Sequence, residues 1–222
     1  HTDEYDPVIV SGLTLTAGNS DAAAANDDGG AVYIDDAGPV ELNDVAISGN
    51  TAGDEAGGGV YASGAGVEIT DSTISGNSAE YGGGFADFDD EDGYYGPIEF
   101  KNTTVSGNTA TGSGGGIYFY QLYSGAQIED SQISGNLAGG DGGGLHVEDT
   151  DGVSRLEISR SRVNDNFAGG QGGGINFNDL DGQVQILETA VSGNTANGGG
   201  GGGAYFEGTS APVSIKDSTV SN

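Results

Sequence analysis

Residues 114–136 read GGGIYFYQLYSGAQIEDSQISGN. Apolar and polar residues alternate here in three short runs, around Ile117, Ile128 and Ile133, and turn-forming residues separate the runs. Alternation with a period of two predicts short strands, and no apolar stripe with helical spacing is present. The stretch therefore predicts three short strands joined by tight turns.

The same phrase recurs along the chain. S-G-N-like phrases end at Asn19, Asn50, Asn77, Asn108, Asn136, Asn166 and Asn194, at intervals of 31, 27, 31, 28, 30 and 28 residues. A fixed period in this range is typical of solenoids, whose stacked copies bury a continuous core that one copy cannot form alone. Propeller blades need longer repeats.

We predict one all-β domain over residues 1–222, with an N-terminal arm at 1–7 and repeats over 8–222. The repeats form a parallel β-helix of about seven coils of about 29 residues, with three short strands per coil.

The recurring asparagines have a structural explanation. Identical amides stacked in successive coils can donate to and accept from one another, as they do in other stacked-strand assemblies. We expect such a ladder from Asn50, Asn77, Asn108, Asn136, Asn166 and Asn194.

The chain carries 34 acidic and five basic residues, for a formal net charge of −29, and no cysteine. Nucleic acid and anionic membrane surfaces need basic residues and are excluded as partners, and no stretch is long and apolar enough for membrane insertion.

Glu41, Glu68 and Glu99 share one outward position in successive copies. Their repulsion predicts either screening by water or a bound cation.

The phrase I-S-G-N-T-A followed by G-G-G-[IV]-Y resembles the repeats of bacterial surface proteins with right-handed β-helices. These include the polymorphic outer-membrane proteins and Gly/Asn-rich pectate-lyase-like repeat proteins, and residues 11–19 look like the first coil of the latter. The resemblance implies a right-handed parallel β-helix and an extracellular, cell-surface setting.

Three acidic turns are candidate Ca²⁺ sites, because D-x-D-G supplies two hard carboxylate ligands and a turn. The alternative is that these turns are merely solvated. The predicted metal ligands are Asp149 and Asp151, Asp179 and Asp181, and Asp90 and Asp92.

Outward and loop aromatics are candidate glycan-binding residues, because tyrosine rings stack on sugars. The alternative is that they shield strand edges. The candidates are Tyr94, Tyr95, Tyr118, Tyr120 and Tyr123, and residues 87–97 form the longest departure from the repeat.

No catalytic residue is predicted. Related folds cleave acidic polysaccharides with a basic residue, which leaves Arg155, Arg160, Arg162 and His146 to consider. Ladder positions explain most of these bases: Arg160 is expected between Asp130 and Glu188, Lys101 next to Glu129, and His146 in a surface column of tyrosines.

Both ends of the chain interrupt the pattern without a recognisable cap. We consider a segment of a longer surface protein, a subunit that stacks end to end into a filament, and a capping arm formed by residues 1–7. The expected function is a structural or adhesive rod, with a lyase, glycosidase or glycan-binding module as the alternative.

Overall fold

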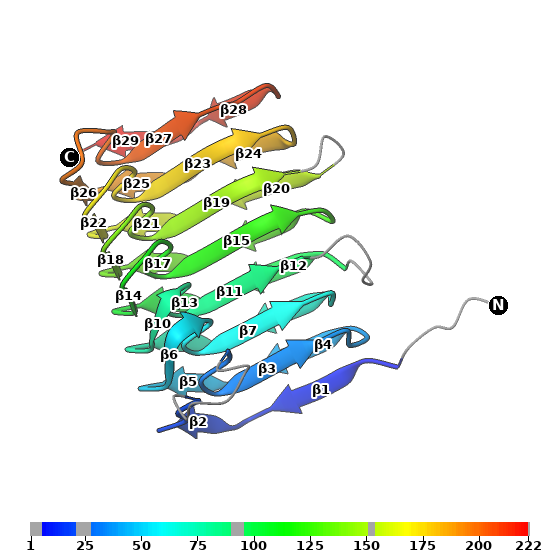
Figure 1. Cartoon of the computed structure of the whole chain (residues 1–222). Coiled ribbons are helices and arrows are strands. Elements are labelled where there is room, and N and C mark those ends of the chain that lie inside the picture. Colours follow the sequence, from blue (N-terminus) through cyan, green and yellow to red (C-terminus); the bar gives the residue numbers. More distant parts are fainter. Residues whose placement is uncertain (1–5, 21–27, 90–95, 151–153, 222) are drawn as a thin grey trace.

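The alternating runs of each repeat form strands, and equivalent strands of successive repeats pair in parallel (Figure 1). This computed structural model describes residues 6–20, 28–89, 96–150 and 154–221. Within these residues the chain winds through four parallel sheets and contains no helix. The predicted parallel β-helix is thus the observed architecture.

A coil in the middle of the rod contributes one strand to each sheet, in the order D, A, B, C. In the described residues the first coil contributes only to sheets A and B, and the last only to sheets D, A and B. Sheet D comprises β3 (Val32–Asp35), β7 (Val60–Ser63), β11 (Phe85–Phe88), β15 (Ile117–Leu122), β19 (Leu145–Thr150), β23 (Ile175–Leu180) and β27 (Ala204–Glu207). Sheet A comprises β1 (Val8–Ser11), β4 (Val40–Asn43), β8 (Val67–Thr70), β12 (Ile98–Lys101), β16 (Ala126–Glu129), β20 (Arg155–Ser159), β24 (Gln183–Leu187) and β28 (Val213–Lys216). Sheet B comprises β2 (Thr14–Thr16), β5 (Ala46–Ser48), β9 (Thr73–Ser75), β13 (Thr104–Ser106), β17 (Gln132–Ser134), β21 (Arg162–Asn164), β25 (Ala190–Ser192) and β29 (Thr219–Ser221). Sheet C comprises β6 (Thr51–Ala56), β10 (Ser78–Tyr81), β14 (Thr109–Ala110), β18 (Leu137–Ala138), β22 (Phe167–Ala168) and β26 (Thr195–Ala196).

The expectation of three strands per coil missed sheet C. Its strands follow the ladder asparagine, and four of the six are only two residues long, such as Thr109–Ala110. Two residues cannot display an alternation, so the pattern carried no strand signal there. Pairing with the coils above and below makes the dipeptide a strand.

Apolar columns run along the axis inside the coils. Phe85 pairs in register with Val60 and Ile117, and all three are fully buried. Phe85 also packs edge-to-face on Phe100 of sheet A, with ring centroids 5.1 Å apart. The core is therefore built by contacts between coils and across the coil, as stacked repeats require.

The corner between sheets A and B uses a left-handed backbone in seven successive coils. The corner residues have φ between 47° and 53°: Asp44, Asp71, Asn102, Asp130, Arg160, Glu188 and Asp217. Asp and Asn tolerate this conformation best. The next residue is usually Ser or Thr, and its buried hydroxyl joins neighbouring coils: Ser131 Oγ accepts from Thr103 N and donates to Glu129 O. This hydroxyl ladder was not anticipated from the sequence.

The asparagines form the expected amide ladder. Asn77 donates through its backbone N–H and through Nδ2 to Asn108 Oδ1, at 2.9 and 3.0 Å, and the pattern repeats from Asn50 to Asn194. In the first coil Gly18 occupies the ladder position and donates to Asn50 Oδ1 at 2.8 Å, whereas Asn19 lies opposite Thr51.

Glycines beside the ladder allow its close approach to the backbone. A Cβ on Gly116 would lie 2.6 Å from Gly144 O and 2.9 Å from Asn136 Nδ2. Both distances are too short for a carbon, so contact between coils requires the glycine that precedes β15, and the same holds for Gly59, Gly84, Gly144 and Gly174 before their sheet D strands.

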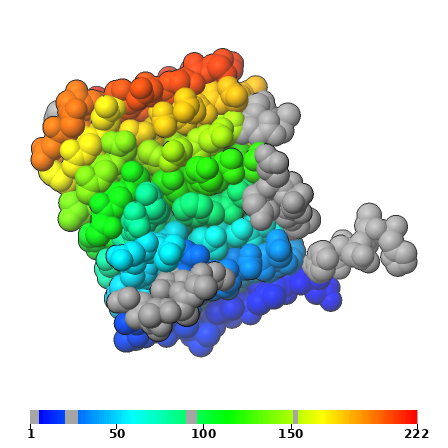
Figure 2. All heavy atoms as spheres, viewed as in Figure 1, coloured from blue at the N-terminus to red at the C-terminus, as the bar shows by residue number. Residues whose placement is uncertain are grey.

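Among the described residues, β1 and β2 at one end of the rod and β28 and β29 at the other pair with a neighbouring strand on one side only. The coils between them form successive coloured layers in Figure 2. Val8 and Ile9 of β1 are 55% and 59% exposed, and Ile215 and Val220 at the other end are 43% and 52% exposed. The described residues include no helix long and apolar enough to cross a membrane.

Candidate functional site

An aromatic stripe runs along the outer face of sheet D. It is formed by Tyr33, Tyr61, Phe88, Tyr118, Tyr120 and His146 of sheet D, and Tyr81, at the end of β10 in sheet C, packs against it. Tyr61 and Tyr118 belong to one outward column, which Ala86 interrupts between them. Phe88, two residues after Ala86, bridges the interruption, with its ring 5.9 Å from Tyr61 and 5.2 Å from Tyr118. The stripe is therefore continuous although the column is not.

Tyr118 is the centre of a polar cluster within the stripe. Its ring stacks on His146 with centroids 5.2 Å apart, and its hydroxyl donates to Glu148 Oε2 at 2.6 Å. His146 Nε2 lies 3.6 Å from the same oxygen. Burial, and then Glu148, raise the pKa of the Tyr118 hydroxyl. The His146 imidazole, helped by the Tyr118 hydroxyl, holds the pKa of Glu148 below its usual range.

The glycan-binding prediction is wrong for Tyr118. Its side chain is only 3% exposed, because the rings of Tyr81, Phe88 and His146 pack against it, each with its centroid 5.2 Å from that of Tyr118. A buried ring offers no face to a sugar. His146, 4% exposed, is likewise not the surface residue that the sequence suggested. Tyr120 and Tyr123 are half-buried, and Tyr94 and Tyr95 lie outside the described residues.

The structure describes only some of the residues in the acidic turns. Asp149 and Asp179 occupy equivalent left-handed positions, with φ of 64° and 50°. Thr150 Oγ1 accepts from the backbone N–H groups of Asp181 and Gly182, at 3.0 and 2.7 Å, and thereby holds the second turn. Asp90, Asp92 and Asp151 lie outside the described residues. The residues that are described contain no group of three or more His, Cys, Asp or Glu side chains that could hold a metal ion. The Ca²⁺ sites stay predictions.

The basic residues contact carboxylates. Arg160 lies in the corner column between Asp130 and Glu188, as expected. Its guanidinium binds Asp130, with Nε 3.0 Å from Oδ1, and also contacts Glu129. Lys101 pairs with Glu68 at 3.2 Å and with Glu99, although it lies in register with Glu129 as expected. It thereby relieves part of the repulsion in the column of Glu41, Glu68 and Glu99.

Arg155 is held in the same way. Its guanidinium contacts Glu157 Oε2 at 2.5 Å and donates to Gln185 Oε1 at 2.8 Å. Lys101, Arg155 and Arg160 are therefore engaged in the side-chain ladders of the rod.

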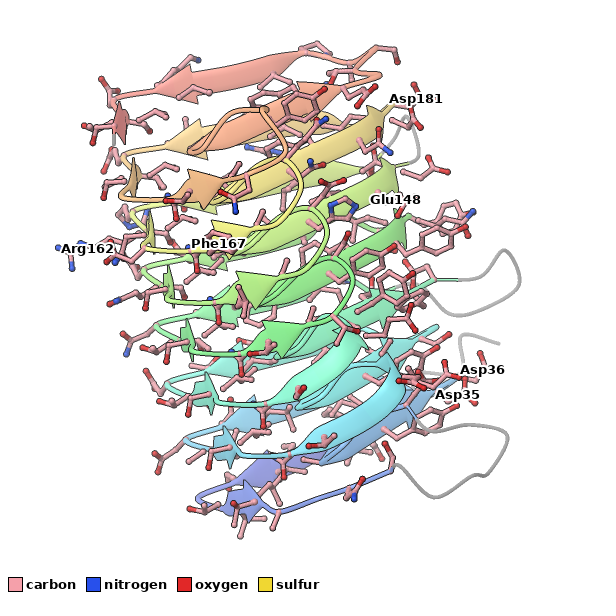
Figure 3. The ribbon with its side chains drawn as sticks, turned by 60° about the vertical axis from the view of Figure 1, so that its left-hand side comes forward. Asp35, Asp36, Glu148, Arg162, Phe167 and Asp181 are labelled. Carbon is pink, nitrogen blue, oxygen red and sulfur yellow. The ribbon has the colours of Figure 1, made fainter. Side chains whose placement is uncertain are left out.

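A polar groove of about 480 Å³ follows the corner between sheets A and B. Arg160 and Arg162 lie on it together with Asp130, Gln132 and Ala190, among others. Ala190 follows Arg162 in the same outward column, and its small side chain leaves room there. No carboxylate of the described chain lies within ion-pair distance of Arg162, which projects from the edge opposite Asp181 and Glu148 (Figure 3).

Asp87 has a position that the sequence analysis did not recognise. The acidic run from Asp87 was counted as part of a loop, yet Asp87 lies within β11 and is fully buried. The available signal was its spacing, because a residue two positions after the inward Phe85 must also face inward.

Comparison with known proteins identifies the fold family. The family described as the right-handed beta helix region matches residues 10–188. No curated protein and no solved structure matches significantly.

Proposed function

The chain belongs to the right-handed β-helix family, and from this premise we propose that it is a structural or adhesive rod of an extracellular cell surface. One observation carries the proposal: three of the four basic side chains considered for a polysaccharide-cleaving site are engaged within the rod. Arg155 and Arg160 contact carboxylates, and His146 is buried against Tyr118. Groups in such contacts are not poised to take a proton from a substrate.

The surface of the rod supports this role. A net charge of −29 spread over stacked coils keeps rods apart laterally and favours cationic partners. Asp35, Asp36, Glu148 and Asp181 follow one edge of the rod (Figure 3). Repulsion between the sides leaves the ends as the surfaces best able to associate.

The open strand edges support growth along the axis. The first coil presents β1 and β2, and the last presents β28 and β29, so both ends offer strands of sheets A and B. We propose that the end of one copy pairs with the start of a second copy, which is a head-to-tail contact that does not close. The pairing would cover exposed Val8, Ile9, Ile215 and Val220.

Negative-stain electron microscopy tests this proposal. We expect rods longer than one molecule, with a length that grows with protein concentration. Ile215→Lys places a charge on the exposed edge and should abolish elongation, whereas Ser134→Lys on the lateral face should not. Particles that remain single molecules at every concentration would contradict end-to-end stacking. The proposal would then be restricted to a rod that forms one segment of a longer surface protein.

The alternative is a polysaccharide-active or glycan-binding protein, and the corner groove favours it. Arg162 lies on this groove beside hydroxyl and amide side chains, a lining that resembles the polar surfaces used to bind sugars. Product formation from a polysaccharide panel, lost in Arg162→Ala, Arg155→Ala or His146→Ala, would support this alternative and overturn the structural role. Sugar binding without product, lost only in Arg162→Ala, would identify an adhesive groove.

A further inference from the structure

Asp87 occupies a core position that the other described coils fill with apolar side chains. Its register partners are Ala62 in the preceding coil and Phe119 in the next, both fully buried. The column consists of Ile34, Ala62, Asp87, Phe119, Val147, Phe177 and Phe206. A carboxylate in this column is not explained by the repeat.

The carboxylate of Asp87 lacks a partner in the described structure. Both oxygens are buried and neither accepts a hydrogen bond. Asp89, 6% exposed, is a second buried carboxylate just beyond the end of β11, and its Oδ2 accepts from the backbone N–H of Tyr123 at 3.3 Å. Burial, and then the neighbouring Asp89, raise the pKa of Asp87 well above its ordinary range. An unpaired ionised carboxylate in an apolar interior is among the costliest groups a fold can contain.

We propose that Asp87 and Asp89 are ligands of a divalent cation with the chemistry of Ca²⁺, held inside the coil at the carboxyl end of β11. Two buried carboxylates carry a charge of −2, which one divalent cation balances. Their oxygens are hard ligands, and Ca²⁺ completes its shell with backbone carbonyls and water without requiring a fixed geometry. The pair differs from the D-x-D-G turns, because Asp87 lies inside the coil.

The competing chemistry is a proton. A protonated Asp87 would remove one charge and would leave Asp89 as a single buried anion. The two chemistries predict different responses. A cation makes stability depend on Ca²⁺ at neutral pH, whereas a proton makes stability rise toward acid pH whether Ca²⁺ is present or not.

Two measurements on the whole chain, stripped of metal with a chelator, test the site. The first is tyrosine-sensitised Tb³⁺ luminescence, which suits a chain with ten tyrosines and no tryptophan. We expect emission that Ca²⁺ displaces, and loss of most of it in Asp87→Leu. The second is the melting temperature, which should rise by roughly 5–10 °C at a Ca²⁺ concentration a hundredfold above the dissociation constant. Asp87→Asn and Asp87→Leu should remove this rise.

The matched control is the double variant Asp149→Asn/Asp179→Asn, which removes two exposed-turn carboxylates and keeps Asp87. It should retain the Tb³⁺ emission of the buried pair and the Ca²⁺-dependent rise in melting temperature. The proposal is overturned if the Asp87 variants respond to Ca²⁺ as the unmodified chain does. It is equally overturned if the unmodified chain ignores Ca²⁺ and instead gains stability on acidification in a way that Asp87→Leu abolishes.

Discussion

Asn136 Oδ1 accepts two hydrogen bonds from Asn108, one from the backbone N–H at 2.9 Å and one from Nδ2 at 3.0 Å. Asn136 Nδ2 in turn donates to Val105 O and to Asn166 Oδ1. Each amide thus connects its own coil to the coil before it and to the coil after it. It also satisfies backbone groups that would otherwise be buried without partners.

Replacing one ladder asparagine should therefore be costly. Asn136→Ala leaves buried donors of Asn108 and the carbonyl of Val105 without partners, and we expect a loss of about 2–4 kcal/mol in the free energy of unfolding. Urea denaturation measures this loss. Asn197→Ala, at an exposed position outside the ladder, should change stability by less than about 0.5 kcal/mol. Equal effects of the two substitutions would contradict the structural role of the ladder.

The glycines beside the ladder make a second prediction. Gly116→Ala introduces a Cβ 2.6 Å from a backbone oxygen, which must force coils apart and should destabilise the fold by more than about 2 kcal/mol. Gly135→Ala meets no atom within 4 Å, and its φ of 63° costs only about 1–2 kcal/mol. Thermal unfolding should rank Gly116→Ala as the more damaging change, and the reverse order would refute the contact argument.

The Glu148 cluster predicts a dependence of stability on pH. The pKa of Glu148 is lowered in the folded state by His146 and Tyr118, while Tyr81 is a further neighbour of its charge. A carboxyl group whose pKa is lowered in the folded state stabilises the fold at every pH above its pKa in the unfolded chain, about 4.3. This stabilisation is lost as the pH falls through the lower pKa of the folded state.

The stability difference between the unmodified chain and Glu148→Gln measures this contribution. The Glu148 side chain is 41% exposed, so we expect less than about 1 kcal/mol at pH 7, and this contribution should disappear as the pH falls through the lowered pKa of Glu148. A difference that does not change as the solution is acidified from pH 7 would show that the carboxylate charge is not responsible.

Arg160 interrupts an acidic corner column, and its charge should be measurable. Arg160→Asp places like charges beside Asp130 and Glu188 in a left-handed position that Asp tolerates. We expect a loss of about 1 kcal/mol at low salt that shrinks at high salt, because exposed charges are screened. Arg160→Asn fits the same backbone without adding charge and should lose less. A salt-independent loss, equal in both variants, would exclude an electrostatic role.

The features predicted from the sequence share one property, which is that each coil repeats them. Ile133, Asn136 and the corner at Asp130 could be assigned because the same residue type returns at the same place in nearly every copy. Two repeated features were missed, sheet C, whose strands are too short to alternate, and the hydroxyl ladder, whose Ser and Thr residues resemble ordinary turn residues. The other missed features depend on differences between neighbouring coils. Phe88 fills the interruption left by Ala86, Lys101 reaches back to Glu68, and Ala190 leaves space beside Arg162.

The sequence by itself determined the architecture. Its apolar residues alternate with a period of two inside a repeat of about 29 residues, and stacking the repeats as parallel coils buries every apolar column. It also identified the asparagines as a ladder, since only stacking explains identical amides at that spacing. Only the tertiary structure decided which polar and aromatic groups are accessible. Tyr118 is buried among the rings of neighbouring coils, and Asp87 lies inside the coil. Exposure depends on what the adjacent coil and turn place over a side chain, and a repeat pattern read one copy at a time does not contain that information.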